Sequence, residues 1–300
     1  MAETAPAPRG PAVVTGASSG IGRAFAENLA RRGHPLLITA RRGPRLEALA
    51  RWARDQHGVP VRVVVADLAT DAGLATVRAA IDDLDAPPEV AVLNAGFGTR
   101  GAIATLDRER ESDMVRLNCL AVADLAAHIV PMMVRARRGA LVVVSSAAAF
   151  QPIPHMATYA ATKAFELHYT EALADELRAC GVRAVAVCPG PVATEFTTGA
   201  GSRIALPIPI EDPQMVVRAT WRALGAGRPV VPAGPVARLA WAAARIVPRR
   251  ARVRIAGRIH RITAPVDAPD RPPGEAGNGG GGRETSDRWP SEPPASTSVT

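Results

Sequence analysis

The 300-residue sequence predicts a doubly wound α/β fold, in which helices cover both faces of one parallel sheet. Short runs of Val, Ile, Leu and Ala alternate along the chain with longer segments of helical periodicity. The runs are apolar at nearly every position, which is typical of parallel strands buried on both faces. We therefore expect a single Rossmann-like domain over residues 11–235, followed by a basic amphipathic extension over residues 236–262.

The apolar runs and the periodic segments between them give the order of the elements. Six strands are expected, at residues 12–15, 36–40, 61–66, 90–94, 140–145 and 183–187. Between them we expect helices at 21–32, from the arginines after the second strand to 57, and at 72–84, 107–137 and 158–180. Pro131 predicts an interruption of the fourth helix. A loose leader over residues 1–10 and a disordered tail over residues 263–300 complete the chain.

Composition excludes several classes of protein. No run of 18 apolar residues is free of charge, so no membrane-spanning helix is expected. The first residues lack the basic and apolar regions of a secretory signal. Cys119, Cys180 and Cys188 show no metal-ligand spacing and no pairing pattern, so we expect neither a metal site nor a disulfide framework. These features fit a cytoplasmic location.

Positive charge is concentrated late in the chain. The net charge is +8, and residues 213–266 contain arginines but no acid. Among the 36 basic residues, Lys163 is the single lysine. Because arginine cannot release its proton and presents a wide planar fork, a lone lysine indicates a position that needs a compact charge.

A glycine-rich turn follows the first strand. Gly16, Gly20 and Gly22 have the spacing G-x-x-x-G-x-G, and a helix follows at once. Such a turn brings backbone N–H groups and a helix N-terminus close to a pyrophosphate. An ordinary β–α turn is the alternative, and the strand before, the helix after and the repeated βα units favour a dinucleotide site.

The residues after the second strand bear on which dinucleotide is bound. Sites for NAD place an acid there to bind the ribose 2′-hydroxyl, whereas this chain has Arg41 and Arg42. Guanidinium groups bind a 2′-phosphate well, so we expect NADP(H) rather than NAD(H). Two solvated arginines at a helix start are the alternative. Asp67, which ends the third strand, is placed either at the adenine end or as the N-cap of the next helix.

The chemistry-bearing residues stand near the fifth strand. Tyr159 and Lys163 are spaced i and i+4 on one helix, so that a nearby ammonium is expected to lower the tyrosine pKa. Such a tyrosine can exchange a proton with an alcohol or carbonyl oxygen. The hydroxyl of Ser146, at the strand end, could hold the same oxygen.

Taken together, these motifs resemble the short-chain dehydrogenase/reductase family over residues 11–221. The matching residues are TGASSGIG (15–22), Asp67, Asn94-Ala95-Gly96, Asn118, Ser146, Tyr159-x-x-x-Lys163 and Pro189-Gly190-Pro191-Val192-x-Thr194. The resemblance implies that Tyr159 is the general acid/base and that Lys163 binds the nicotinamide ribose. It also implies that Ser146 orients the substrate oxygen and that Asn118 holds a water for proton relay.

The resemblance also extends the expected cofactor site. Ser18 and Ser19 stand where NADP-preferring members often have a further basic residue, which is a departure from that pattern. The expected cofactor residues are Gly16, Ser18, Ser19, Gly20, Ile21, Gly22, Arg41, Arg42, Asp67, Leu68, Asn94, Ala95, Gly96, Tyr159, Lys163, Pro189, Gly190, Val192 and Thr194. Family members commonly pair through the helices that bear Asn118 and Tyr159, so a homodimer or homotetramer is implied.

Two segments predict the substrate pocket. The loop after Ser146 offers Phe150, Ile153, His155 and Met156, and the segment after Thr194 offers Phe196 within a Gly- and Pro-containing stretch that could form a lid. These residues are mostly apolar, so we expect a hydrophobic small-molecule carbonyl or alcohol as the substrate.

The basic extension leaves two interpretations open. An amphipathic basic helix can lie on an anionic membrane, here at the inner membrane surface, or it can pack on the domain with a solvated arginine face. No nucleic-acid-binding module is recognisable. The leading hypothesis is thus an NADP(H)-dependent oxidoreductase that interconverts a carbonyl and an alcohol. The alternatives are a non-catalytic NADP(H)-binding scaffold or sensor, and a membrane-surface adaptor.

Overall fold

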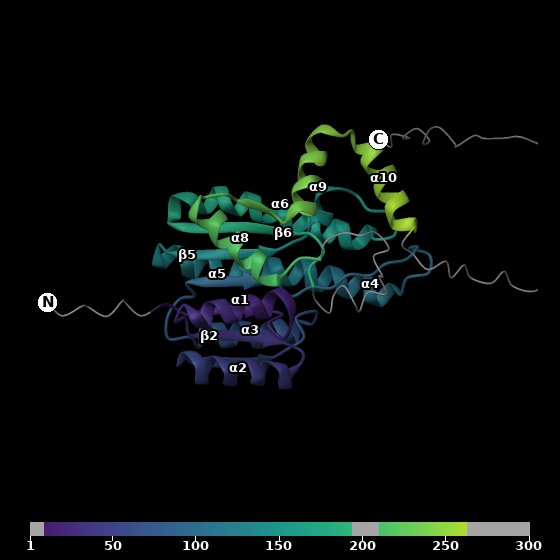
Figure 1. The fold of residues 1–300 in the computed structure, drawn as a ribbon. Helices are drawn as coiled ribbons and strands as arrows, with labels where there is room; N and C mark the ends of the chain where they lie inside the picture. Colours follow the sequence, from purple (N-terminus) through teal and green to yellow (C-terminus); the bar gives the residue numbers. More distant parts are fainter. Residues whose placement is uncertain (1–8, 194–209, 263–300) are drawn as a thin grey trace, which may run out of the picture. The chain divides into compact units, whose positions relative to one another are not determined.

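The computed structural model describes residues 9–193 and 210–262 of the chain. Over these ranges it contains one seven-stranded parallel sheet with the strand order β3-β2-β1-β4-β5-β6-β7 (Figure 1). The strands are β1 (Ala12–Thr15), β2 (Leu36–Ala40), β3 (Val61–Val65), β4 (Val90–Leu93), β5 (Gly139–Val144), β6 (Val182–Pro189) and β7 (Val230–Ala233). Each pair of neighbours is parallel, which confirms the doubly wound fold.

The seventh strand is a correction to the six that the sequence predicts. β7 has only four residues, includes Pro232 and is half-buried over most of its length. It pairs with the end of β6, with Ala186 opposite Val230 and Pro189 opposite Ala233. Pro232 interrupts the aliphatic run by which the other strands are recognised, and Pro is tolerated because β7 is an edge strand.

Helices cover the sheet in two layers. One face is covered by α1 (Gly20–Arg31), α2 (Gly43–His57) and α8 (Pro213–Gly225), and the other by α3 (Asp71–Asp82), α5 (Ala121–Ala136) and α6 (Ala157–Leu177). Strand residues alternate between these faces: Val14 and Val92 contact the first layer, while Val13 and Ala91 contact the second. This two-sided burial is the physical reason that the strands are apolar throughout.

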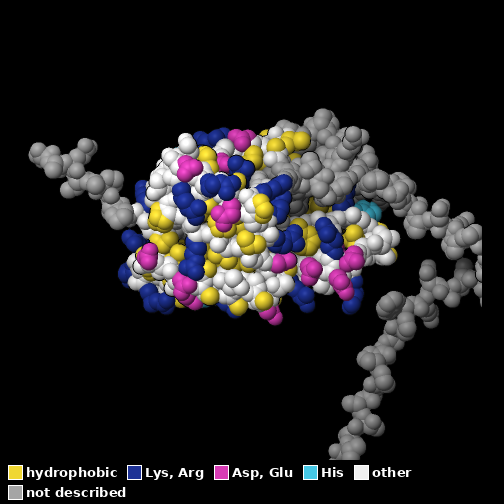
Figure 2. All heavy atoms as spheres, turned by 90° about the horizontal axis from the view of Figure 1, so that it is seen from below, with side chains coloured by type: hydrophobic (Ala, Val, Ile, Leu, Met, Phe, Trp, Pro, Cys, Tyr) yellow, Lys and Arg dark blue, Asp and Glu magenta, His cyan; other side chains and the backbone are white. Residues whose placement is uncertain are grey.

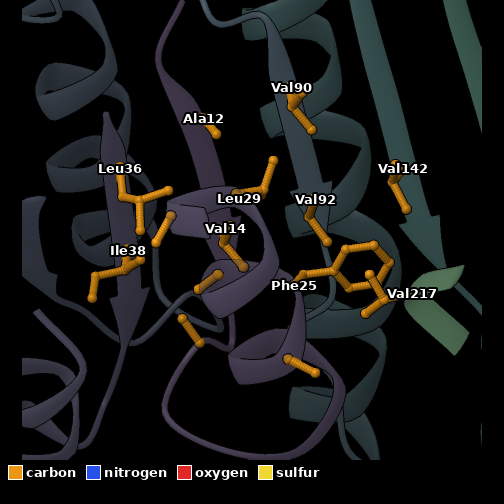
Figure 3. Packing of buried hydrophobic residues seen from close by; sticks show 14 of the residues in the cluster. Ala12, Val14, Phe25, Leu29, Leu36, Ile38, Val90, Val92, Val142 and Val217 are labelled. Carbon is orange, nitrogen blue, oxygen red and sulfur yellow. The ribbon is translucent and has the colours of Figure 1, made fainter. Parts of the chain in front are cut away.

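The core beneath α1 shows how the layers interlock. Phe25 and Leu29 of this helix are fully buried and lie against the valines of β1 and β4 (Figure 3). Val217 of α8 approaches the same ring from the neighbouring helix (Figure 3). Burying a side chain of the size of Phe25 stabilises the fold by roughly 1.5–3 kcal/mol, so this contact holds α1, and the turn before it, against the sheet.

The long fourth helix differs from the prediction. It consists of α4 (Arg108–Val115), a π-helical turn (Arg116–Leu120) and α5, and it continues through Pro131. The interruption predicted at Pro131 is therefore wrong. Pro131 lies on the exposed side, where the helix can absorb its bulk, and the irregular turn falls instead at the position of Asn118.

Among the described residues, the helical stretch Arg108–Ala136 is the one that is long and apolar enough to cross a membrane. Its α5 part buries Leu125, Ile129 and Met133 completely against the sheet. α5 is therefore a core helix of the α/β domain.

The basic extension forms two helices, where the sequence predicts one segment of continuous periodicity. These are α9 (Pro235–Ile246) and α10 (Arg249–Ile262), the lightest ribbons in Figure 1. Val247 adopts an extended conformation before Pro248, which ends α9 because a residue before proline is disfavoured in a helix. The predicted leader falls largely, and the predicted tail entirely, outside the described residues.

The surface beyond the extension is mixed in charge. Figure 2 views the lower side of Figure 1, where basic and acidic side chains intermingle and no large area of one sign forms. In the sequence, most arginines of the later part of the chain fall within α8, α9 and α10.

Candidate active site

A cavity of about 620 Å³ lies at the carboxyl edge of the sheet, where doubly wound folds bind their ligands. It is lined by three of the predicted catalytic residues, Ser146, Tyr159 and Lys163, and by Ile153 and Met156 of the predicted pocket. Most of the predicted cofactor residues also line it: Gly16, Ser18, Ser19, Gly20, Ile21, Arg41, Arg42, Asp67, Leu68, Asn94, Ala95, Gly96, Pro189, Gly190 and Val192.

The other predicted residues are placed differently. Gly22, Asn118, Phe150 and His155 do not line the cavity, although each lies close to an element that does. Thr194 and Phe196 lie outside the described residues, as does most of the predicted lid.

The glycine turn is held in a shape that only glycine allows. Gly16 and Gly20 have φ values of 66° and 56°, in the left-handed region. A Cβ at Gly22 would lie 2.4 Å from the Gly16 carbonyl oxygen, so no side chain fits there. The Asn94 amide closes the turn from β4 by donating to the carbonyl oxygens of Thr15 (3.1 Å) and Gly16 (3.3 Å). Since α1 begins at Gly20 with no acid in its first turn, its N-terminal N–H groups fit an anion such as a pyrophosphate.

Basic side chains stand at one end of this turn. Arg42 donates to Ser18 Oγ (2.9 Å) and to Ser19 Oγ (2.7 Å), which fixes the guanidinium over the turn. Arg41 is exposed and lies 3.7 Å from Asp67 Oδ2. Two guanidinium groups and two hydroxyls form a donor set that suits a phosphate monoester on the adenine ribose.

Asp67 does not cap the following helix, so that alternative is wrong. Thr70 is the N-cap of α3, and its hydroxyl accepts from Gly73 N (3.1 Å). Asp67 instead accepts from Ala69 N (3.0 Å) within its own turn and presents its other oxygen to Arg41 at the cavity wall.

Tyr159 and Lys163 project from the first half of α6 toward the end of β5. The Lys163 ammonium lies 5.9 Å from the centroid of the Tyr159 ring. It donates to the Val144 carbonyl (3.1 Å) and to both carboxylate oxygens of Glu166 (2.9 Å each). Sequence reasoning missed Glu166, and the available signal was an acid three residues after Lys163, on its side of the helix.

The pKa of Tyr159 differs from the expectation. Burial raises it, and this effect outweighs the lowering by the Lys163 ammonium and by a hydrogen bond with the Ser146 side chain. The negative charge of Glu166 raises the pKa of Tyr159 further. The sequence predicts a lowered value because it shows the lysine but neither the depth of the phenol nor the acid behind it.

Asn118 is fully buried on the π-helical turn, near Lys163. Its amide nitrogen donates to the Phe97 carbonyl (2.9 Å) and to Thr162 Oγ1 (3.0 Å), and its Oδ1 accepts from Phe97 N (3.2 Å). A Cβ at Gly96 would lie 3.0 Å from this Oδ1 and 3.4 Å from Lys163 Nζ. Asn118 thus does not line the cavity, and Gly96 lies close to both its Oδ1 and the Lys163 ammonium.

The substrate side is formed by the loop after β5 and by the basic extension. Phe150 is buried against Trp241 of α9, with ring centroids 5.0 Å apart, rather than facing the cavity. His155 has a left-handed backbone and its carbonyl accepts from Gly101 N (2.9 Å). In their place the extension contributes apolar lining that sequence reasoning missed, namely Val236, Ala240 and Ile259.

The extension is fastened to that loop. Arg252 of α10 donates to the Phe150 carbonyl (2.7 Å). A Cβ at Gly257 would lie 3.1 Å from Pro154 Cγ, so α10 packs closely on the loop. The inner faces of α9 and α10 therefore pack on the domain, as one of the two interpretations expects. The outer face of α9 exposes Leu239 and Ile246 by 72% and 81%.

Comparisons with known proteins agree with this geometry. The family model described as short chain dehydrogenase matches residues 11–204. An uncharacterized oxidoreductase of Myxococcus xanthus is 40% identical over 187 residues, which are 62% of this chain and 73% of that protein. The inactive hydroxysteroid dehydrogenase-like protein 1 of Homo sapiens is 32% identical over 188 residues, which are 62% of this chain but only 57% of that protein.

A solved structure shares both the fold and the sequence pattern. The short-chain dehydrogenase from Sphingobium yanoikuyae in complex with NADPH has a TM-score of 0.71 and 37% identity, and the match covers 78% of this chain and 93% of that one. The family match covers more than half of the chain and contains the glycine turn, Ser146, Tyr159 and Lys163. The chain belongs to the short-chain dehydrogenase/reductase family of oxidoreductases.

Proposed function

We propose that this protein is an NADP(H)-dependent oxidoreductase that interconverts a carbonyl and an alcohol on a hydrophobic small molecule. The observation that carries the proposal is that one cavity is lined both by the glycine turn and by Ser146, Tyr159 and Lys163. A scaffold that only binds the dinucleotide has no need of all three polar groups beside an apolar substrate pocket.

The side chains have distinct parts in the proposed reaction. Bound nicotinamide supplies the hydride in reduction and accepts it in oxidation. Ser146 holds the substrate oxygen, and Tyr159 donates a proton to that oxygen in reduction and removes it in oxidation. The Lys163 ammonium stabilises the phenolate that remains after reduction. A water relay through Asn118 stays a prediction, since the described contacts of its amide are with Phe97 and Thr162.

The preference for NADP(H) is supported by the arginines at the adenine end. Arg41 and Arg42 line the cavity, and they stand directly after β2, where NAD sites have an acid. The NADPH complex of the Sphingobium yanoikuyae relative is in keeping with this choice.

The central test replaces the proposed proton donor. Tyr159→Phe is expected to abolish turnover, measured at the nicotinamide absorbance with a panel of aliphatic and aromatic carbonyls and alcohols. NADPH binding, followed by cofactor fluorescence, is expected to stay within a fewfold of wild type, since only a hydroxyl is removed. Tyr169→Phe, elsewhere on α6, is the matched control. Full activity in Tyr159→Phe, or a wild type that binds NADPH and turns over no member of the panel, would favour the scaffold.

We also propose that the outer faces of α9 and α10 contact an anionic phospholipid surface on the cytoplasmic side of a membrane. Exposed arginines stand next to exposed aliphatic residues in three pairs, Arg238–Leu239, Arg245–Ile246 and Arg254–Ile255. An arginine can pair with a lipid phosphate while its neighbour enters the acyl boundary. The inner faces of the same helices line the substrate cavity, so a membrane-dissolved substrate would enter from this side.

Vesicle co-sedimentation of the full chain tests this contact. Wild type is expected to sediment with vesicles of phosphatidylcholine plus phosphatidylglycerol and to remain in solution with phosphatidylcholine alone. The double variant Leu239→Ser, Ile246→Ser is expected to lose most of the binding, whereas Val65→Ser, an exposed valine at the opposite edge of the sheet, is not. Equal partitioning of wild type to both kinds of vesicle would end the proposal.

Besides the substrate and the membrane surface, a second copy of the chain is a proposed partner. Val115, Leu120 and Phe165 are exposed apolar residues on α4, the π-helical turn and α6. These are the helices through which members of this family commonly pair, so we propose a homodimer or homotetramer built on them.

A further inference from the structure

The pairing of Lys163 with a buried acid is not accounted for by the proposed reaction. The Glu166 side chain is 1% exposed and that of Lys163 is 6% exposed. Both carboxylate oxygens lie 2.9 Å from the same Nζ, so the carboxylate is bidentate on the ammonium. Burying an acid in the core costs free energy unless it is paired, and here the partner is the chain's single lysine.

The ammonium is therefore shared between two groups on α6. Tyr159 lies one helical turn before Lys163, and Glu166 lies nearly one turn after it. Lys163 makes its remaining described hydrogen bond to the Val144 carbonyl, at the end of β5. With these bonds in place, Nζ is fixed 5.9 Å from the centroid of the Tyr159 ring and in direct contact with the Glu166 carboxylate.

Few other titratable groups face this pair. Cys119 approaches from the π-helical turn and Cys188 from β6, and burial raises their pKa values to about 11 and about 12, which keeps both thiols neutral near pH 7. Ser145 contributes a hydroxyl from the end of β5, and Glu171 acts on Cys188 from further along α6. The effect of neighbouring charges on Tyr159 thus comes chiefly from Lys163 and Glu166.

We propose that Glu166 is a positioning residue that fixes the Lys163 ammonium and weakens the positive charge it presents to Tyr159, which sets the pH range in which Tyr159 exchanges its proton. Burial raises the pKa of Glu166 to about 7, against the lowering by Lys163. Above that pH the negative charge of the Glu166 carboxylate offsets the positive charge of Lys163, and Tyr159 therefore holds its proton more tightly. Below that pH the carboxyl group is neutral and no longer offsets the positive charge of the ammonium.

The composition of the chain allows a direct test that does not depend on turnover. The sequence has two tyrosines, so Tyr169→Phe leaves Tyr159 as the single one. In that background, the ultraviolet absorbance of tyrosinate against pH gives the pKa of Tyr159. Glu166→Gln is expected to lower this midpoint by roughly one pH unit, because an opposing charge is removed while the side-chain length is kept. Glu171→Gln, a partly exposed acid on the same helix, is expected to leave it unchanged.

The inference rests on the proposed function for its meaning in catalysis, and its test separates the two. In an active enzyme, the pH midpoint of kcat/KM for alcohol oxidation is expected to move down with the titration. An unchanged Tyr159 midpoint in folded Glu166→Gln and in the apolar replacement Glu166→Leu overturns the inference, whatever the activity. A shifted midpoint in a protein that turns over no carbonyl upholds the inference about Glu166 and contradicts the proposed function instead.

Discussion

At the scale of single residues, the site depends on how closely a few groups approach Lys163. The Nζ atom is held by Val144 and Glu166, and Gly96 leaves it just enough room on the cavity side. The lysine side chain therefore has little room to move when a neighbouring residue is replaced by a larger one. The spacing Tyr159-x-x-x-Lys163 predicts the pair but not this confinement, because Val144 and Gly96 come from β5 and from the segment after β4, which are distant from Lys163 in the sequence.

Gly96→Ala tests that confinement. The added methyl would lie 3.0 Å from Asn118 Oδ1 and 3.4 Å from Lys163 Nζ, so one of the two must shift. We expect kcat to fall roughly tenfold or more, since small misplacements of a catalytic group are costly. Gly225→Ala, where a Cβ would meet nothing within 4 Å, serves as the control in the same assay. Wild-type kcat in Gly96→Ala would contradict the confinement of Lys163 by its neighbours.

The prediction from the sequence and the structure differ most at the scale of single residues. The positions of Ser146, Tyr159 and Lys163 could be predicted because their order and spacing are specific. The raised pKa of Tyr159 could not, because it depends on burial and on Glu166, and both are set by packing between α6, β5 and β6.

At the scale of elements, the turn between β1 and α1 is fixed by contacts from two other segments. Asn94 closes it from β4, and Arg42 fastens Ser18 and Ser19 from the start of α2. Arg42 thus both shapes the turn and supplies positive charge beside it. The two serines, which depart from the family's basic pattern, are the acceptors that hold this arginine in place.

Arg42→Ala is expected to raise KM for NADPH roughly 10- to 100-fold, which corresponds to one or two charge-assisted hydrogen bonds. KM for NADH should change much less, because that cofactor has no 2′-phosphate. Steady-state kinetics with both cofactors measures the ratio. Arg51→Ala, an exposed arginine further along α2, is the matched control. An equal rise for NADH and NADPH would mean that Arg42 only shapes the turn.

The elements themselves were largely predictable, with specific exceptions. The strands β1 to β6 lie within one residue of their predicted bounds, except that β6 extends two residues further, to Pro189. β7, the π-helical turn and the break at Pro248 differ from the prediction for local reasons: a short edge strand, a single inserted residue in a helical turn and a proline within continuous periodicity. Each is too small to alter the periodicity on which the prediction relies.

At the scale of the whole molecule, the extension is part of the catalytic domain rather than an appendage. The sequence separates residues 236–262 from the pocket because their charge differs from that of the rest. The structure brings Val236, Ala240 and Ile259 to the cavity because β7 returns the chain to the carboxyl edge of the sheet. Contacts between segments a hundred residues apart, such as Arg252 with Phe150, carry no signal in local periodicity.

Assembly can be tested on the exposed helices. Leu120→Arg is expected to convert a dimer or tetramer to a smaller species, because it places a charge in the centre of the proposed interface. Light scattering after size-exclusion chromatography measures the mass. Val65→Arg at the sheet edge should keep the wild-type mass. A monomeric wild type would contradict the proposed pairing.

The single lysine has a practical consequence. Its side chain is almost entirely covered, so reagents that acylate primary amines find no lysine on the surface of the native protein. Any modification of Lys163 that builds up with time would report how often the pocket opens to a molecule of that size.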